Sequence, residues 1–279
     1  MGSVKTVLLV VGGLLVAVTL LLPVLRKLRP GQDFSGFTAR LKAWWVMSLS
    51  FLLIQRINGS LSLVGFAGLS GMSLREVLHR IDQLPPGLRY LCYLTVPIQY
   101  YLVWIGWYGM FIVFIPVYVF LYLPTRLTVE ADSIRRAATL HWGLMTTVFC
   151  VSHAAYLLKF PGGPGLLLFV MLLTEWGEAL RLLFPAGAFR DALVVATSLA
   201  IGWWLGVLTP LTANHALLAG FVLGVAGEVG DRRMQALRLA LQLGEGPLKP
   251  GQGGGLLRIL TLSFTAPLFL HGYRYFYTL

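Results

Sequence analysis

The chain has 279 residues, of which 57% are hydrophobic and only 12% are charged, and its mean hydropathy is +0.77. A soluble globular domain carries about 25% charged residues, so this composition excludes one and indicates an integral membrane protein. The 22 Lys and Arg exceed the 11 Asp and Glu, which gives a net charge of +11. In a membrane protein such an excess lies on cytoplasmic loops and faces anionic lipid rather than nucleic acid.

The first apolar segment, residues 6–25, is long enough to cross a bilayer, which takes about 20 apolar residues. Basic residues flank it on both sides, and it lacks the small-residue cleavage site of a signal peptide. We therefore expect an N-terminal transmembrane helix within residues 1–30.

Further apolar stretches follow, some of them too short to cross a membrane alone. They run over residues 43–54, 59–72, 90–106, 108–123, 138–158, 166–184, 192–208, 213–226 and 256–271. Gln55, Arg56 and Asn58 separate the first two, which form either two half-helices or one interrupted span, since polar residues at that depth need protein or water around them. The predicted fold is an all-α polytopic helical bundle of about nine transmembrane segments. We expect residues 1–279 to form a single membrane domain, with the bundle over residues 40–279.

Basic residues cluster in three stretches, residues 26–42, 126–136 and 232–249. The positive-inside rule predicts that these stretches lie on the cytoplasmic side of the membrane. The N-terminus would then begin on the other side.

Two pairs of acidic residues lie inside or at the end of apolar segments. They are Glu175 with Glu178, and Glu228 with Asp231. The spacing of three places each pair on one helix face, and two such pairs on facing helices would supply the oxygen ligands that a divalent cation prefers. Alternatively, nearby cations neutralise them in interhelical salt bridges. These cations are Arg181, Arg232 and Arg233.

Cysteine and histidine give no sign of a metal centre or a disulfide framework. Cys92 and Cys150 lie in apolar surroundings, in no CxxC pair and at no Cys/His spacing typical of a metal site. His141, His153 and His215 likewise form no metal motif, and we expect them to be hydrogen-bonded packing residues.

A glycine-rich run occupies residues 250–255. Clustered glycines let backbone amides approach a phosphate closely, whereas a flexible loop explains the same run equally well. The residues alone leave both interpretations open.

The run PGQGGGLLRILT over residues 250–261 is followed by Ala266-Pro267-Leu268-Phe269 and His271. This pattern resembles the C-terminal end of the phosphatidate cytidylyltransferase (CDP-diacylglycerol synthase) family, which reads Pro-Gly-His-Gly-Gly, Asp-Arg-x-Asp-Ser and Ala-x-Pro-x-Phe. Residues 44–47, 73–76, 97–101, 107–109, 114–118, 142–145 and 151–153 resemble a bacterial branch of the family. The similarity therefore runs from about residue 40 to the end, and it implies a multi-pass protein of a bacterial-type inner membrane with a cleft on the cytoplasmic side.

The resemblance implies an enzyme that joins CTP to phosphatidate with a divalent metal, releasing pyrophosphate and yielding CDP-diacylglycerol. An active enzyme would use Glu228 and Asp231 as catalytic acids. Its Mg²⁺ ligands would be Glu175, Glu178, Glu228 and Asp231. Its phosphate and nucleotide contacts would be Arg232, Arg233, Lys249, Arg258 and the amides of Gly253 and Gly254.

The chain departs from the family pattern at the residues on which the transferase chemistry depends. Leu257 and Leu260 stand where the family has its two Asp, and Gln252 replaces the His. Gly177-Glu178 replaces an Asn-Asp pair, and the family's Ser-Pro-x-Lys-Thr-x-Glu-Gly loop is missing between residues 184 and 192. Replacing Asp by Leu in a metal site removes oxygen ligands. These changes therefore predict weak binding of metal and triphosphate.

Three functions remain in competition. The leading hypothesis is a catalytically impaired homologue, a pseudoenzyme that binds phosphatidate-like phospholipid as a regulatory or accessory subunit, as a homodimer or in complex with a lipid-synthesis enzyme. The alternative is an active CTP-dependent cytidylyltransferase with a rebuilt Mg²⁺ site. A transporter or an assembly scaffold that uses the same fold is the third, although no inverted repeat is visible in the sequence.

Overall fold

The structure is a computed structural model of the chain, and it describes residues 2–28, 38, 41–42, 44–45, 59–81, 84–122, 133–240 and 254–278. All secondary structure in these residues is helical, which confirms the predicted all-α class. Contacts divide the chain into two compact units. Unit 1 comprises residues 1–61 with 245–247, and unit 2 comprises residues 62–244 with 248–279.

Unit 1 contains the helix α1, Gly2–Leu28, in the place predicted for an N-terminal helix. Leu15 and Leu22 lie seven residues apart, two turns along one face of α1, and form a buried cluster with Leu41. Trp45 closes over this cluster and its Nε1 donates a hydrogen bond to Thr19 Oγ1 at 3.0 Å. The polar group at Gln55, Arg56 and Asn58 lies outside the described residues, so its two interpretations stay open.

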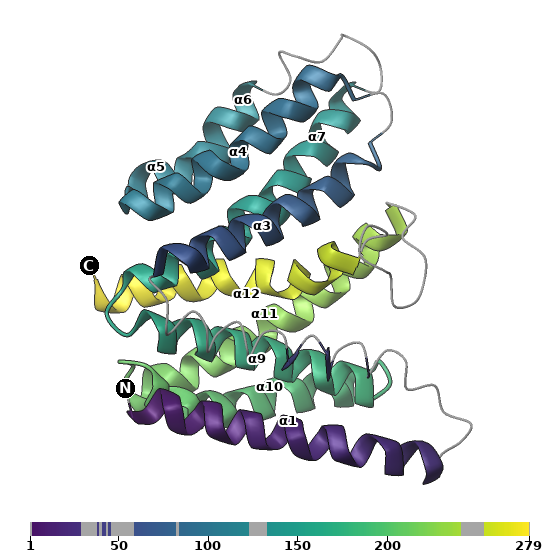
Figure 1. Cartoon of the computed structure of the whole chain (residues 1–279), viewed down its shortest axis with the longest axis vertical. Coiled ribbons are helices and arrows are strands. Elements are labelled where there is room, and N and C mark those ends of the chain that lie inside the picture. Colours follow the sequence, from purple (N-terminus) through teal and green to yellow (C-terminus); the bar gives the residue numbers. More distant parts are fainter. Residues whose placement is uncertain are drawn as a thin grey trace. The chain divides into compact units, whose positions relative to one another are not determined.

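Unit 2 holds the remaining helices, which follow the predicted apolar stretches closely (Figure 1). They are α3 (Gly59–Leu78), α4 (Pro86–Ile105), α5 (Tyr108–Val113), α6 (Phe120–Tyr122), α7 (Ser133–Leu144), α8 (Cys150–Tyr156), α9 (Gly163–Leu183), α10 (Ala188–Leu205), α11 (Ala213–Ala240) and α12 (Gly254–Tyr277). Two π-helical turns join them end to end, Phe114–Val119 between α5 and α6 and Met145–Phe149 between α7 and α8. Short 3₁₀ turns, Leu157–Lys159 and Gly206–Leu208, follow α8 and α10.

The boundary between α4 and α5 shows how the sequence sets a helix end. Pro86 stands in the first turn of α4, where its missing N–H costs nothing. Gly106 ends the helix with φ 73°, a left-handed conformation that glycine adopts without a steric penalty, and its N–H bonds to the carbonyls of Leu102 and Val103. The chain turns there and begins α5 two residues later.

Helices α9 to α12 lie side by side, with α11 in contact with α9, α10 and α12 (Figure 1). Small residues allow α10 and α11 to approach closely. A Cβ added to Gly220 would lie 2.4 Å from the carbonyl oxygen of Ser198 and 3.0 Å from the Cα of Gly202, so no larger residue fits there without a shift. This packing fixes the register between α10 and α11, and with it the charged residues that both helices carry.

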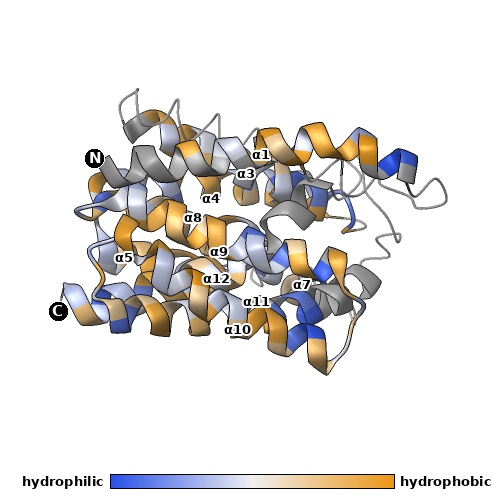
Figure 2. Cartoon of the chain, turned by 90° about the horizontal axis from the view of Figure 1, so that it is seen from below, coloured by the Kyte–Doolittle hydropathy of each residue, from blue (hydrophilic) through white to orange (hydrophobic). Residues whose placement is uncertain are grey.

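Four helices of the described residues are long and apolar enough to cross a membrane. They cover Leu61–Leu78, Gly163–Arg181, Ala188–Leu208 and Ala213–Arg233. Figure 2 shows hydrophobic residues along the helices of unit 2 and hydrophilic residues gathered toward helix ends. Cys92 and Cys150 are both free thiols, as expected from their surroundings. The described residues therefore support a helical membrane protein.

Candidate functional site

Charged side chains from α9, α10 and α11 meet inside unit 2. Two come from the last turns of α9, two from the first turn of α10, and two from the middle of α11. We call this group the charge cluster: Glu178, Arg181, Arg190, Asp191, Glu228 and Arg232.

Arg181 lies at the centre of the charge cluster, between two carboxylates. Its Nη1 donates to Glu228 Oε1 at 2.5 Å, and its Nη2 donates to Glu178 Oε1 at 3.3 Å. The side chains of Arg181 and Glu228 are only 6% and 7% exposed. Because buried charges need partners, this single cation pairs with one acid from each of two neighbouring helices, and Arg190 beside Glu228 supplies a second positive charge.

Two glycines leave room for the Arg181 guanidinium. A Cβ added to Gly177 would lie 3.4 Å from its terminal nitrogens, and one added to Gly227 would lie 3.5 Å from Nη1. The guanidinium thus occupies space next to the backbone of both α9 and α11. A side chain at either glycine would crowd this central cation.

A threonine on α12 joins the cluster from a fourth helix. The buried hydroxyl of Thr261 donates a hydrogen bond to Glu178 Oε1, the same oxygen that Arg181 contacts. The Glu178 carboxylate therefore accepts from both α9 and α12. This contact holds the N-terminal half of α12 against α9.

The outer part of the cluster continues the alternation of charge. Arg190 Nη2 lies 3.6 Å from Glu228 Oε2 and 3.0 Å from Asp191 Oδ1. Asp191 in turn accepts from Arg232, whose side chain is 66% exposed. Three carboxylates and three guanidinium groups therefore alternate from the buried centre to the surface, and their formal charges cancel.

The arrangement does not fit a divalent cation. A hard cation takes six or more oxygen ligands, and a metal between α9 and α11 would need the carboxylate oxygens that Arg181 already contacts. Within the described part of the chain, no three of His, Cys, Asp and Glu come together in a way that could hold a metal. Of the two interpretations drawn from the sequence, the geometry favours the salt bridges.

The predicted acids and cations are only partly brought together. Glu178 and Glu228 meet across α9 and α11, as facing acids should, but through Arg181 rather than directly. Glu175 and Asp231 are half-buried on the same two helices, and Arg233 is exposed. Lys249, Gly253 and Gln252 lie outside the described residues. Gly254, Leu257, Arg258 and Leu260 belong to α12, but the structure does not describe their side chains.

Sequence reasoning missed Arg190 and Asp191. They stand at the start of α10, in the stretch interpreted only as a missing loop. The sequence does contain a signal for them, because two charged residues directly before an apolar segment mark a helix end. Charged side chains at such an end need partners of opposite charge. Their partners on α11 depend on tertiary packing, which no local pattern gives.

His153 and His215 are hydrogen-bonded packing residues, as predicted, whereas His141 packs against Phe120 and its Nδ1 has no hydrogen-bond partner among the described residues. His153 is fully buried, its Nδ1 lies 2.8 Å from the carbonyl of Phe149, and its ring packs on Phe111. His215 Nδ1 lies 2.6 Å from the hydroxyl of Tyr277.

The fold and the charge cluster define a helical protein of membrane type with paired charges among its apolar helices. No family model and no solved structure matches the chain. The chain is 33% identical over 274 residues to uncharacterized protein YnbB of Escherichia coli (strain K12), an alignment that covers 88% of this chain and 90% of YnbB. The chain therefore belongs to the family of YnbB.

Proposed function

We propose that this protein is a membrane-embedded homologue of the phosphatidate cytidylyltransferases that has lost the transferase chemistry and binds phospholipid as an accessory or regulatory subunit. Its chain crosses a bacterial-type inner membrane about nine times, with the charge cluster toward the cytoplasmic side. It acts as a homodimer or beside an active enzyme of phospholipid synthesis.

The observation that carries this proposal is the position of Arg181. A cytidylyltransferase needs free carboxylates to hold metal against a triphosphate. Here the acids of α9 and α11 that would do so, Glu178 and Glu228, both bind the same buried guanidinium. A metal could enter only by displacing a cation that is itself held between two helices.

The substitutions on α12 point the same way. Leu257 and Leu260 replace two acids of the family pattern, and an apolar side chain supplies no metal ligand. The chain thus differs from an active enzyme in two independent respects, a neutralised acid pair and missing acids. One compensating change would not repair both.

Phospholipid binding is supported by what the chain retains. The apolar helices remain long enough to span a bilayer, and α11 places Arg232 and Arg233 at the end of its candidate span. Guanidinium groups bind phosphate through paired hydrogen bonds, so this end of α11 suits the phosphate of a phosphatidate-like lipid.

The test is CTP-dependent formation of CDP-diacylglycerol by the purified protein in phosphatidate-containing vesicles with Mg²⁺. The controls are a cytidylyltransferase with the complete family motif and the variant Glu228→Gln. We expect no product above background where the positive control turns over, and phospholipid that stays bound through purification. Mg²⁺-dependent turnover that Glu228→Gln abolishes would overturn the proposal and establish the alternative, an active enzyme with a rebuilt metal site.

A further inference from the structure

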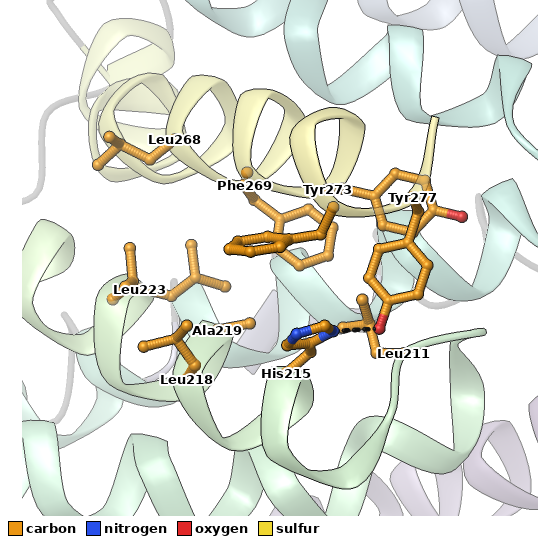
Figure 3. A pocket seen from close by; sticks show the side chains of 12 residues that line it. Leu211, His215, Leu218, Ala219, Leu223, Leu268, Phe269, Tyr273 and Tyr277 are labelled. Carbon is orange, nitrogen blue, oxygen red and sulfur yellow. Dashed lines mark hydrogen bonds between the residues drawn. The ribbon is translucent and has the colours of Figure 1, made fainter. Parts of the chain in front are cut away.

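An apolar pocket lies between the beginning of α11 and the end of α12, far from the charge cluster. Its volume is about 90 Å³, and α11 and α12 supply opposite walls (Figure 3). The α11 wall includes Leu218, Ala219 and Leu223, and the α12 wall includes Phe269, Tyr273 and Phe276. We call it the α11–α12 pocket.

Small residues keep this pocket open. Ala219 on α11 and Gly272 on α12 both line it and fill little of the space between their helices. The bulky residues around them then form the rim. For comparison, an apolar cavity of about 150 Å³ binds benzene, which has six carbons. The α11–α12 pocket, at about 90 Å³, therefore accommodates a few carbons of a chain.

One end of the pocket is polar. The Tyr277 hydroxyl accepts a hydrogen bond from the backbone N–H of Thr212 at 2.9 Å, and it lies 2.6 Å from His215 Nδ1 (Figure 3). If Nδ1 carried the proton, the hydroxyl hydrogen would have no partner among the described residues. We therefore assign the hydroxyl as donor to Nδ1, which leaves the imidazole proton on Nε2.

The Nε2–H of His215 is then a hydrogen-bond donor without a partner in the described part of the chain. His215 lines the pocket, and Figure 3 shows its second ring nitrogen on the side away from Tyr277, toward the apolar wall. A donor at the end of an apolar pocket fits a ligand with a hydrocarbon chain and one acceptor oxygen, because the apolar walls match the chain and the donor matches the oxygen.

The surroundings of the pocket identify where such a ligand comes from. The α11 wall belongs to the candidate membrane span Ala213–Arg233. Large apolar side chains of this span that line the pocket are partly exposed, among them Leu218 at 45% and Val222 at 36%. On a membrane-spanning helix, such side chains face lipid hydrocarbon. The molecules that reach the rim are therefore membrane lipids.

We propose that the α11–α12 pocket binds the acyl-ester part of a membrane lipid, with the first carbons of one acyl chain between Ala219 and Gly272 and the ester carbonyl oxygen accepting from His215 Nε2–H. This site is separate from the charge cluster, since His215 and Glu228 lie about 20 Å apart along α11 at 1.5 Å per residue. It does not depend on whether the protein has lost cytidylyltransferase activity.

The test uses photocrosslinking in phosphatidylcholine vesicles that contain the full-length protein. Two probe lipids carry a diazirine near the start of an acyl or alkyl chain, one with ester linkages and one with ether linkages that lack the carbonyl. Irradiation followed by peptide mapping measures labelling of α11 and α12. We expect the ester lipid to label these helices about fivefold more than the ether lipid, since it alone accepts the hydrogen bond. Equal labelling of the unmodified protein by both lipids would overturn the proposal.

Two variants locate the site. Ala219→Phe fills the pocket and should abolish the labelling, whereas Ala192→Phe, at an exposed position on α10, should leave it unchanged. His215→Phe keeps a ring but removes the donor, so labelling by the two lipids should become equal. Undiminished labelling in a folded Ala219→Phe protein would contradict the site. Binding of phosphatidate at the charge cluster would be unaffected by Ala219→Phe, so the outcomes for the two sites are distinguishable.

Discussion

Replacing Arg181 by Met removes the cation between two acids while it keeps much of the side-chain volume. The side chains of Arg181 and Glu228 are 6% and 7% exposed, and Glu178 is 16% exposed, so the variant leaves two carboxylates without their main partner in a largely buried site. Breaking a buried ion pair by removing one member costs about 3 to 5 kcal/mol, most of it the cost of the unpaired charge. We expect Arg181→Met to lower the free energy of unfolding by that amount.

The assay is reversible unfolding of the purified protein in mixed micelles, with increasing denaturing detergent and helix content as the readout. Arg232→Met is the matched control, because Arg232 belongs to the same cluster but is 66% exposed. An exposed ion pair contributes about 0 to 1 kcal/mol, so this control should lose little stability.

A second set of variants isolates the charge from the packing. Glu178→Gln combined with Arg181→Met removes one negative and one positive charge, so the formal charges of the cluster still cancel, and this double variant should recover most of the lost stability. If Arg181→Met and Arg232→Met lose the same stability, or the double variant recovers none of it, the reasoning about buried ion pairs is refuted.

Two further predictions concern the packing that holds the cluster. Gly220→Ala places a Cβ 2.4 Å from the carbonyl of Ser198 and should cost about 1 to 3 kcal/mol in the same assay, whereas Gly65→Ala, with open space around its Cβ, should not destabilise the protein. Thr261→Val keeps the shape of the side chain but removes the donor to Glu178, and should cost about 1.5 to 3 kcal/mol; an unchanged midpoint would show that α12 is not held by this contact.

The helices could be predicted from the sequence because hydrophobicity is a local property of the chain. The apolar stretch predicted over residues 108–123 is helical from Tyr108 to Tyr122. Its passage through a π-helical turn at Phe114–Val119 was not predicted, because that turn depends on the hydrogen bonds of individual carbonyls rather than on composition.

The charge cluster was predictable in part. The spacing of Glu178 and Arg181 places both on one face of α9, and the salt-bridge alternative named Arg181 in advance. That Arg181 lies between α9 and α11, and that Asp191 rather than Glu228 accepts from Arg232, depends on the register of α10 against α11. This register follows from the close approach at Gly202 and Gly220, which the sequence alone does not reveal.

The α11–α12 pocket could not be found from sequence. His215 was expected to be a packing residue. Its contact with Tyr277 joins two residues that are 62 positions apart in the sequence, and no local pattern indicates such a contact. A pocket between two apolar helices leaves no composition signal, since its walls are made of the same residues as the rest of the span.

The most direct test of the central claim is the binding of Mn²⁺, an electron-paramagnetic-resonance probe for Mg²⁺ sites, to the purified protein in phospholipid vesicles with CTP. A cytidylyltransferase with the complete family motif serves as the positive control. The ion pairs that Glu178 and Glu228 form with Arg181 predict no bound Mn²⁺ in this protein under conditions where the control binds it. Bound Mn²⁺ that Glu228→Gln removes would contradict the account and show that these carboxylates are metal ligands.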